Sequence, residues 1–126
     1  MRGDVYLADL NPSRGSEQAG IRPVIIVQRN TIDRFTQTVV VVPITGNQRR
    51  SRIPGTVTIP SGEGGLLQDS VALCYQIVVI DKQRLTRKLG TLSSNYLLML
   101  KEALKYTLQL DDLEVVDEND AVPPTE

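Results

Sequence analysis

Four consecutive valines, Val39 to Val42, constrain the fold of this chain more than any other feature. They lie in Thr38 to Ile44, and their β-branched side chains favour extended backbone. The segment is the most strand-like in the chain, so a β-sheet must form around it. It ends at Pro43-Ile44-Thr45-Gly46, which places Thr45 at a strand end beside a flexible glycine.

Other segments carry weaker strand signals. Val24 to Val27 is a short apolar run typical of a strand buried on both faces. Asn30 to Gln37 is polar and predicts a loop with one helical turn, and Gly46 to Gly55 predicts a loop as well. The remaining predicted strands are Asp4 to Leu10, Thr56 to Ile59 and a long strand from Val71 to Ile80, with a possible short one at Leu113 to Val116.

One convincing helix is predicted, from Ser94 to about Gln109. Ser93 is the expected N-cap, and Leu92 and Leu97 have the spacing of a hydrophobic staple. A stripe of leucines should pack on the sheet: Leu97, Leu100, Leu104 and Leu108. Five to seven short strands with one C-terminal helix predict a mainly β fold, a small, partly closed antiparallel barrel with the helix packed on it.

The charge divides the chain into two parts. Residues 1–110 contain 14 Lys and Arg against 8 Asp and Glu, a net charge of +6, whereas residues 111–126 contain 7 acidic residues and no basic one. We therefore predict a basic barrel domain over 1–110 and an acidic tail over 111–126, whose last ten or so residues should be disordered. A basic domain favours a polyanionic partner.

Composition excludes several kinds of chemistry. The chain has no histidine, so imidazole catalysis, histidine-ligated zinc and Ser-His-Asp triads are ruled out. Cys74 is the only cysteine, which leaves no disulfide framework and no multi-cysteine metal site. We expect no metal and no cofactor. No apolar run approaches the ~20 residues of a membrane span, so we expect a cytoplasmic protein with no membrane partner.

Arg22 is the first candidate for a functional residue. It follows a polar loop, Ser13 to Gly20, in which Gly15 and Gly20 are free to take positive φ, and it directly precedes Pro23, which biases it toward extended geometry. A guanidinium held in this way is suited to binding phosphate. Two alternatives stay open from the residues alone: the polar loop is a solvated hairpin, and Thr45 caps a turn.

Two further groups are candidates. Arg49, Arg50 and Arg52 lie in a loop with little apolar anchoring, where a solvated charge run is the plainest interpretation. Gln76 interrupts an apolar run, so its amide must find hydrogen-bond partners in the fold or in a ligand.

The quoted motifs resemble one family. Gly3-Asp4-Val5-Tyr6, Asp9-Leu10-Asn11-Pro12 and Gly15-Ser16-Glu17-Gln18-Ala19-Gly20-Ile21-Arg22-Pro23-Val24 are similar to the MazF/PemK toxin endoribonucleases. Pro43-Ile44-Thr45, Asp69-Ser70-Val71, Gln76-Ile77 and Asp81-Lys82-Gln83-Arg84-Leu85 match in the same order. The resemblance extends from Arg2 to about Leu110.

This resemblance implies an SH3-like, CcdB-like barrel that acts as a homodimer. It implies metal-independent cleavage of single-stranded RNA (mRNA) at short specific sequences, with 2′,3′-cyclic phosphate and 5′-hydroxyl ends. Arg22 and Thr45 would be the catalytic pair, and Ser16, Gln18 and Gln76 would line the RNA groove. In this context at least one of Arg49, Arg50 and Arg52 is expected to contact phosphate, and Arg49 and Arg50 are the candidates for RNA binding. A cognate antitoxin with an acidic, extended segment would neutralise the toxin by occupying the same groove.

Two alternatives of the same fold remain. One is a gyrase-type toxin, which binds a protein partner in place of cutting RNA. The other is a catalytically inactive, partner-binding barrel. Relatives often have an acidic residue directly before the glutamine and a basic one after the Gln-Ile pair, and these positions are Tyr75 and Val78 here.

Overall fold

The structure is a computed structural model that describes residues 1–12, 15 and 19–111. Within these residues the chain forms seven strands, two α-helices and four 3-10 helices. The strands are β1 Asp4–Asp9, β2 Ile21–Ile26, β3 Thr38–Thr45, β4 Thr56–Ile59, β5 Ser70–Leu73, β6 Val78–Asp81 and β7 Leu85–Thr91. The helices are α1 Asn30–Asp33, α2 Ser94–Thr107, η1 Gln48–Arg52, η2 Glu63–Gly65, η3 Cys74–Gln76 and η4 Lys82–Arg84.

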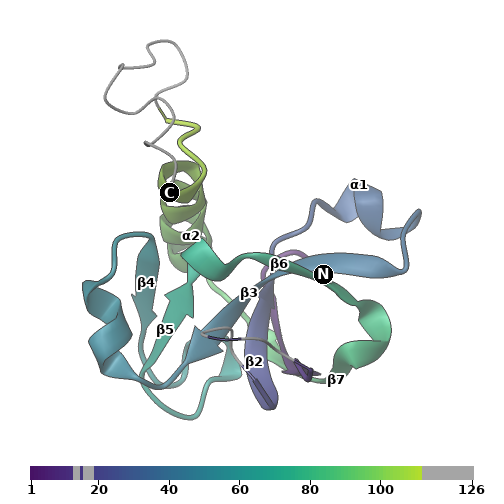
Figure 1. Ribbon diagram of the computed structural model, residues 1–126, viewed down its shortest axis with the longest axis horizontal. Helices are drawn as coiled ribbons and strands as arrows, with labels where there is room; N and C mark the ends of the chain where they lie inside the picture. Colours follow the sequence, from purple (N-terminus) through teal and green to yellow (C-terminus); the bar gives the residue numbers. More distant parts are fainter. Residues whose placement is uncertain (13–14, 16–18, 112–126) are drawn as a thin grey trace.

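All seven strands join one antiparallel sheet in the order β4-β5-β3-β2-β1-β7, with β6 paired separately to β3. The sheet curls around its core, α2 lies beside β4 and β5, and α1 lies at the right-hand end of the view, away from β4 (Figure 1). The predicted mainly β architecture, with a helix at the C-terminal end of the barrel, is confirmed.

β3 changes partner along its length. Its first half pairs with β6, from Thr38↔Asp81 to Val41↔Val78, and its end pairs with β5 through Ile44↔Ala72 and Thr45↔Val71. The chain passes from one partner to the other through η3. The prediction of one continuous strand from Val71 to Ile80 is therefore wrong, because the apolar run serves two shorter strands.

Two other elements differ from the sequence prediction. β7 was not predicted, although its Leu85, Arg87 and Leu89 alternate with Thr86 and Lys88 as a strand would. The predicted loop between Gly46 and Gly55 contains η1, whose N-cap Asn47 accepts a hydrogen bond from the Arg49 N–H at 3.1 Å. α1 is the helical turn expected within Asn30 to Gln37.

The core consists of two clusters, one on each face of the central strands. Val5, Ile25, Val42 and Ile44 belong to one cluster together with Leu100 of α2. The second cluster lies on the other face: Ala8, Leu10, Val24, Ile26, Val39, Val41 and Ile80. Alternate residues of β2 and β3 thus point to opposite faces, and the expectation that β2 is buried on both faces is confirmed.

The helix α2 begins where the sequence predicts, with Ser93 at the N-cap. The Ser93 side chain makes no capping hydrogen bond. Instead, its backbone N–H donates to the Glu63 carboxylate at 2.6 Å, so η2 supplies the acidic group at the helix start. Leu97, Leu100 and Leu104 pack into the core as predicted, whereas Leu108 lies past the helix end and is half-exposed, contrary to prediction.

Cys74 is fully buried in η3, and burial raises the pKa of its thiol to about 12. We predict that a disulfide reagent at pH 8 will not modify the native protein and will modify one thiol per chain after unfolding in guanidinium, because only the exposed thiolate is nucleophilic. Absorbance of the released thiol measures both states. Rapid stoichiometric reaction of the native protein would contradict a buried Cys74.

The same shift makes stability depend on pH. An exposed thiol in the unfolded chain ionises near its ordinary value of 9.0, whereas the buried thiol stays neutral. The stabilisation is complete below pH 9 and is lost as the pH rises toward 12. Relative to Cys74→Ala, the protein should lose about 1.4 kcal/mol of unfolding free energy per pH unit in this window.

No helix among the described residues is long and apolar enough to cross a membrane. Of the predicted acidic tail, only Asp111 is described, in a turn after α2; residues 112–126, including the possible strand at 113–116, lie outside the described residues.

Candidate active site

Arg22 lies within β2 rather than before it, because the strand begins at Ile21, earlier than the predicted Val24. It pairs with Ala8 of β1, and its side chain is exposed. Its Nε donates to the Ala19 carbonyl oxygen at 2.9 Å, the side chain's one hydrogen bond to a described residue. This contact orients the guanidinium and leaves its two terminal nitrogens for a ligand.

Two prolines shape the sheet next to Arg22. The β2–β3 ladder runs from Ile26↔Val41 to Val24↔Pro43 and stops there, and the next residue of β2 is Pro23. Proline has no N–H to donate, so neither residue can contribute a donor to the ladder. Arg22 and Thr45 are the residues two positions beyond this last pair, and each is paired on its other side, Arg22 with Ala8 of β1 and Thr45 with Val71 of β5.

Thr45 is the last residue of β3 and only 8% exposed. Its Oγ1 accepts the N–H of Asn47 at 3.2 Å, which is the turn-capping contact considered from the sequence. This contact uses a lone pair of the oxygen and not its hydrogen, so the hydroxyl can still donate a hydrogen bond. Val24 and Pro43 are paired and so share a face of the sheet. Arg22 is two residues from Val24 and Thr45 is two residues from Pro43, so both side chains belong to that same face.

A hydrogen bond joins the 3-10 helices η1 and η3. Tyr75 and Gln76 are half-buried in η3, and the Tyr75 hydroxyl accepts a hydrogen bond from Arg50 Nη1 at 2.7 Å. Arg50 is thus fixed against the residue before Gln76. Arg49 is exposed on η1, and no ion pair or side-chain hydrogen bond to a described residue holds it.

The loop between β1 and β2 is closed at its base. The Leu10 N–H donates to the Gly20 carbonyl at 2.9 Å, and the Gly20 N–H donates to Asn11 Oδ1 at 3.0 Å. Gly15 and Gly20 have φ of 55° and 77°, as their predicted freedom allows. The candidate residues Ser16 and Gln18 lie outside the described residues.

A cleft of about 550 Å³ opens beside Arg22. Its wall is formed by Leu7 and Pro23, by Ile44 and Gly46 on either side of Thr45, and by the segment Gly65 to Gln68. Arg87 of β7 also lines it. Neither Gln68 nor Arg87 was a candidate from the sequence. The alternation around Leu85 and Leu89 was the signal that would have placed Arg87 on a strand.

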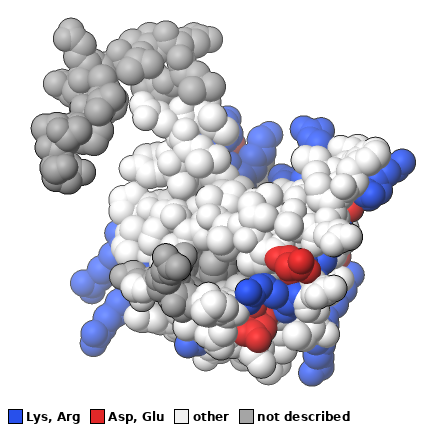
Figure 2. Space-filling model, turned by 45° about the vertical axis from the view of Figure 1, so that its right-hand side comes forward, with Lys and Arg blue, Asp and Glu red and all other residues white. Residues whose placement is uncertain are grey.

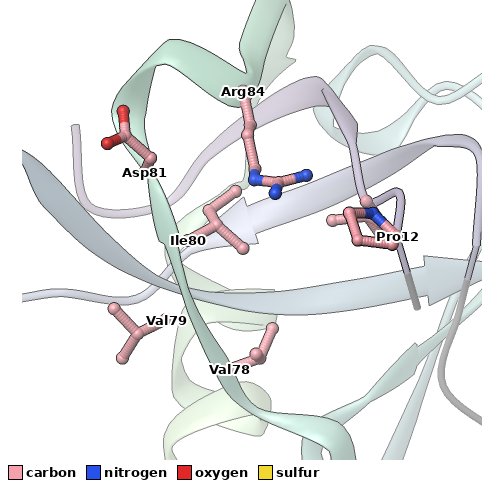
Figure 3. Close-up of a pocket in the computed structure, with 7 residues that line it drawn as sticks. Pro12, Val78, Val79, Ile80, Asp81 and Arg84 are labelled. Atoms are coloured by element: carbon pink, nitrogen blue, oxygen red, sulfur yellow. The ribbon is translucent and has the colours of Figure 1, made fainter. Parts of the chain in front are cut away.

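A second cleft, of about 370 Å³, lies along β6 and contains Arg84. The Arg84 side chain extends over Ile80 toward Pro12, while Asp81 points away (Figure 3). Its Nη1 donates to the Asp9 carbonyl at 3.1 Å and also to the Asn11 carbonyl. Arg84 therefore supports the start of the β1–β2 loop.

Basic side chains project around the edges of the face seen in Figure 2, and the largest acidic areas in view lie on either side of a basic one. Among the described residues, no group of three or more His, Cys, Asp or Glu side chains is placed to hold a metal ion.

The barrel, with an arginine and a threonine at neighbouring strand ends, has the fold of MazF toxins. A mycobacterial endoribonuclease in complex with its cognate antitoxin is 28% identical, with a TM-score of 0.73 over 87% of this chain and 95% of that one. The Mycobacterium tuberculosis toxin MazF-mt6 is 26% identical, with a TM-score of 0.71 over 84% and 96%. MazF from Deinococcus radiodurans shares the fold at 22% identity and a TM-score of 0.73, over 86% of this chain and 94% of that one.

The family assignment rests on the sequence of the whole barrel. Residues 1–108 match the family described as PemK-like, MazF-like toxin of type II toxin-antitoxin system. This chain belongs to that family, as its motifs predicted.

Proposed function

We propose that this protein is a toxin endoribonuclease that cleaves single-stranded RNA at short specific sequences, without a metal ion. The observation that carries the proposal is that Arg22 and Thr45 lie on neighbouring strands, each two residues beyond the Val24↔Pro43 pair that ends the β2–β3 ladder. Family membership and the two mycobacterial relatives, one of them an endoribonuclease by name, support it.

In the proposed reaction the 2′-hydroxyl oxygen attacks the adjacent phosphorus, and the bond from phosphorus to the 5′-oxygen breaks. The 2′-hydroxyl gives up its proton and the 5′-oxygen gains one, so the products are a 2′,3′-cyclic phosphate and a 5′-hydroxyl. Negative charge develops on the phosphorane oxygens. Arg22 would neutralise it with two N–H donors, and the Thr45 hydroxyl would donate a further hydrogen bond.

The remaining candidates would bind the RNA on either side of this pair. We assign RNA contacts to Ser16, Gln18 and Gln76, and phosphate contacts to Arg49 and Arg50. The hydrogen bond from Arg50 to Tyr75 supports a shared surface for η1 and η3. Arg49 is exposed and free to reach the RNA backbone.

We also propose that the protein acts as a homodimer and is neutralised by a cognate antitoxin with an acidic, extended segment. The mycobacterial relative described in complex with its cognate antitoxin supports such a partner. The net charge of +6 over residues 1–110 suits an acidic segment as well as RNA.

The test is to incubate the purified protein with a long synthetic RNA in excess EDTA, beside Arg22→Ala. We expect discrete fragments whose 3′ ends resist periodate until the cyclic phosphate is removed, and none with the variant. Intact RNA with both proteins would overturn the proposal and favour the inactive or gyrase-type barrel. Cleavage that EDTA abolishes would overturn its metal-independent part.

A further inference from the structure

The cleft beside Arg22 combines two kinds of lining that one ligand class would use together. Arg22 and Arg87 contribute positive charge, whereas Pro23, Leu66 and Leu89 form an apolar wall. A volume of about 550 Å³ suits a ligand the size of one nucleotide, since small-molecule sites span ~300 to 1,000 Å³. Phosphate and base are the corresponding parts of such a ligand.

The sheet register places the two arginines on either side of one strand. Ala8 of β1 pairs with Arg22, and its neighbour Leu7 pairs with Arg87 of β7. The two backbones are thus separated by two strand spacings, roughly 10 Å. Arg87 is exposed, and no hydrogen bond or ion pair within the described residues engages its side chain. Leu7 and Ala8 are consecutive in β1, so the two arginines leave the sheet on opposite faces, and what they share is the cleft that both line. The cleft therefore carries positive charge at two places, which suits the phosphates on both sides of one nucleotide.

The segment after η2 supplies a surface for the base. Leu67 is 94% exposed, which is unusual for a leucine that lines a cleft, and the preceding Leu66 is 3% exposed. The adjacent Gln68 side chain has no hydrogen-bond partner among the described residues. It lies against Gly46, where an added Cβ would come within 2.4 Å of its Nε2. An amide beside an apolar wall can recognise the edge of a base that packs there.

We propose that this cleft binds the nucleotide next to the scissile phosphate, with Arg87 on its far phosphate and Gln68 on the edge of its base. Gln68 would then set the base preference at one position of the cleavage sequence. This inference rests on the proposed endoribonuclease function, and it gives that site two residues, Arg87 and Gln68, with separable roles in affinity and in specificity.

The first experiment maps specificity. A randomised single-stranded RNA pool is cut by the wild-type protein and by Gln68→Ala, and the new ends are sequenced. We expect Gln68→Ala to lose about tenfold of the base preference at one position adjoining the cut and to keep the others. Gly46→Ala should disturb the same position, because its methyl group displaces the Gln68 amide. Unchanged preferences in both variants would overturn the role of Gln68.

The second experiment measures affinity. Arg87→Ala should raise KM about tenfold with little change in kcat, and should reduce the slope of log affinity against log salt by about 0.7, the contribution of one single-strand phosphate. Arg34→Ala is the matched control, since it removes an exposed arginine at the end of α1 and outside the cleft. Equal KM values and slopes for the two variants would overturn the role of Arg87.

A binding measurement separates this inference from the proposed cleavage. A fluorescein-labelled, fully 2′-O-methylated RNA 12-mer of mixed sequence cannot be cut, because its attacking hydroxyls are blocked. Weaker binding to Arg87→Ala than to Arg34→Ala by fluorescence anisotropy supports the cleft even if no RNA is cleaved. Cleavage by the wild type with identical binding by both variants overturns the cleft alone. Thermal melting confirms that each variant is folded.

Discussion

Replacing Arg22 with alanine should lower kcat/KM for RNA cleavage by about 10² to 10³-fold, the usual cost of removing one preorganised donor to a developing oxyanion. The side chain is exposed and makes one hydrogen bond to a described residue, to the Ala19 carbonyl. Its loss should therefore leave thermal stability nearly unchanged. Initial rates on a short RNA containing the mapped cleavage sequence measure the effect.

Arg22→Lys separates charge from geometry. It keeps the positive charge and loses the bidentate fork, so its activity should lie between those of the wild type and Arg22→Ala. Arg34→Ala controls for the loss of one positive charge elsewhere on the surface. A decrease shared equally by Arg22→Ala and Arg34→Ala would mean that Arg22 acts only through the net charge of the domain.

The largest effect on stability should come from Gly65→Ala. Gly65 has φ of +77°, and a Cβ there would lie 2.0 Å from the Leu89 backbone oxygen, which cannot turn aside as a side chain would. Positive φ costs about 1 to 3 kcal/mol for a residue other than glycine, and forced overlap in a packed region costs about as much again. These costs are a large fraction of the ~5 to 15 kcal/mol that holds a domain folded.

Gly62→Ala is the control for Gly65→Ala. Gly62 has φ of +95°, but nothing lies within 4 Å of an added Cβ, so it tests the backbone term alone. Gly90→Ala tests the close approach from the other side, since its Cβ would lie 2.7 Å from the Gly64 backbone. Urea denaturation should rank Gly62→Ala as more stable than the other two. Equal stability of Gly65→Ala and Gly62→Ala would show that η2 and β7 do not pack this closely.

The strands with strong local signals could be predicted from the sequence. Four β-branched residues in a row mark β3, and prolines on both sides mark β4, whose bounds Thr56 and Ile59 were predicted to the residue. Such signals reside in neighbouring residues. The break within Val71 to Ile80 could not be predicted in this way, because it depends on β3 offering one edge to two strands.

The site divides similarly. Arg22 and Thr45 were predicted as candidates by motif, and they lie on the neighbouring strands β2 and β3. Arg87, which lines the cleft, was not a candidate because β7 has only Leu85 and Leu89 to mark it, and Gln68 was not one because an exposed glutamine in a loop carries no signal of its own. Their relation to Arg22 is a property of the register between β2, β1 and β7, which local sequence does not encode.

The β2–β3 ladder ends before either strand does, so the last residues of each strand depend on a different neighbour. Beyond Val24 and Pro43, β2 is held by β1, and β3 is held by β5. Arg22 and Thr45 therefore lie on strand ends that are fixed by different neighbours. The distance between them depends on how β1 and β5 pack in the rest of the barrel. If the proposed function holds, substitutions that shift β1 or β5 should alter cleavage by changing this distance, with Arg22 and Thr45 themselves unchanged.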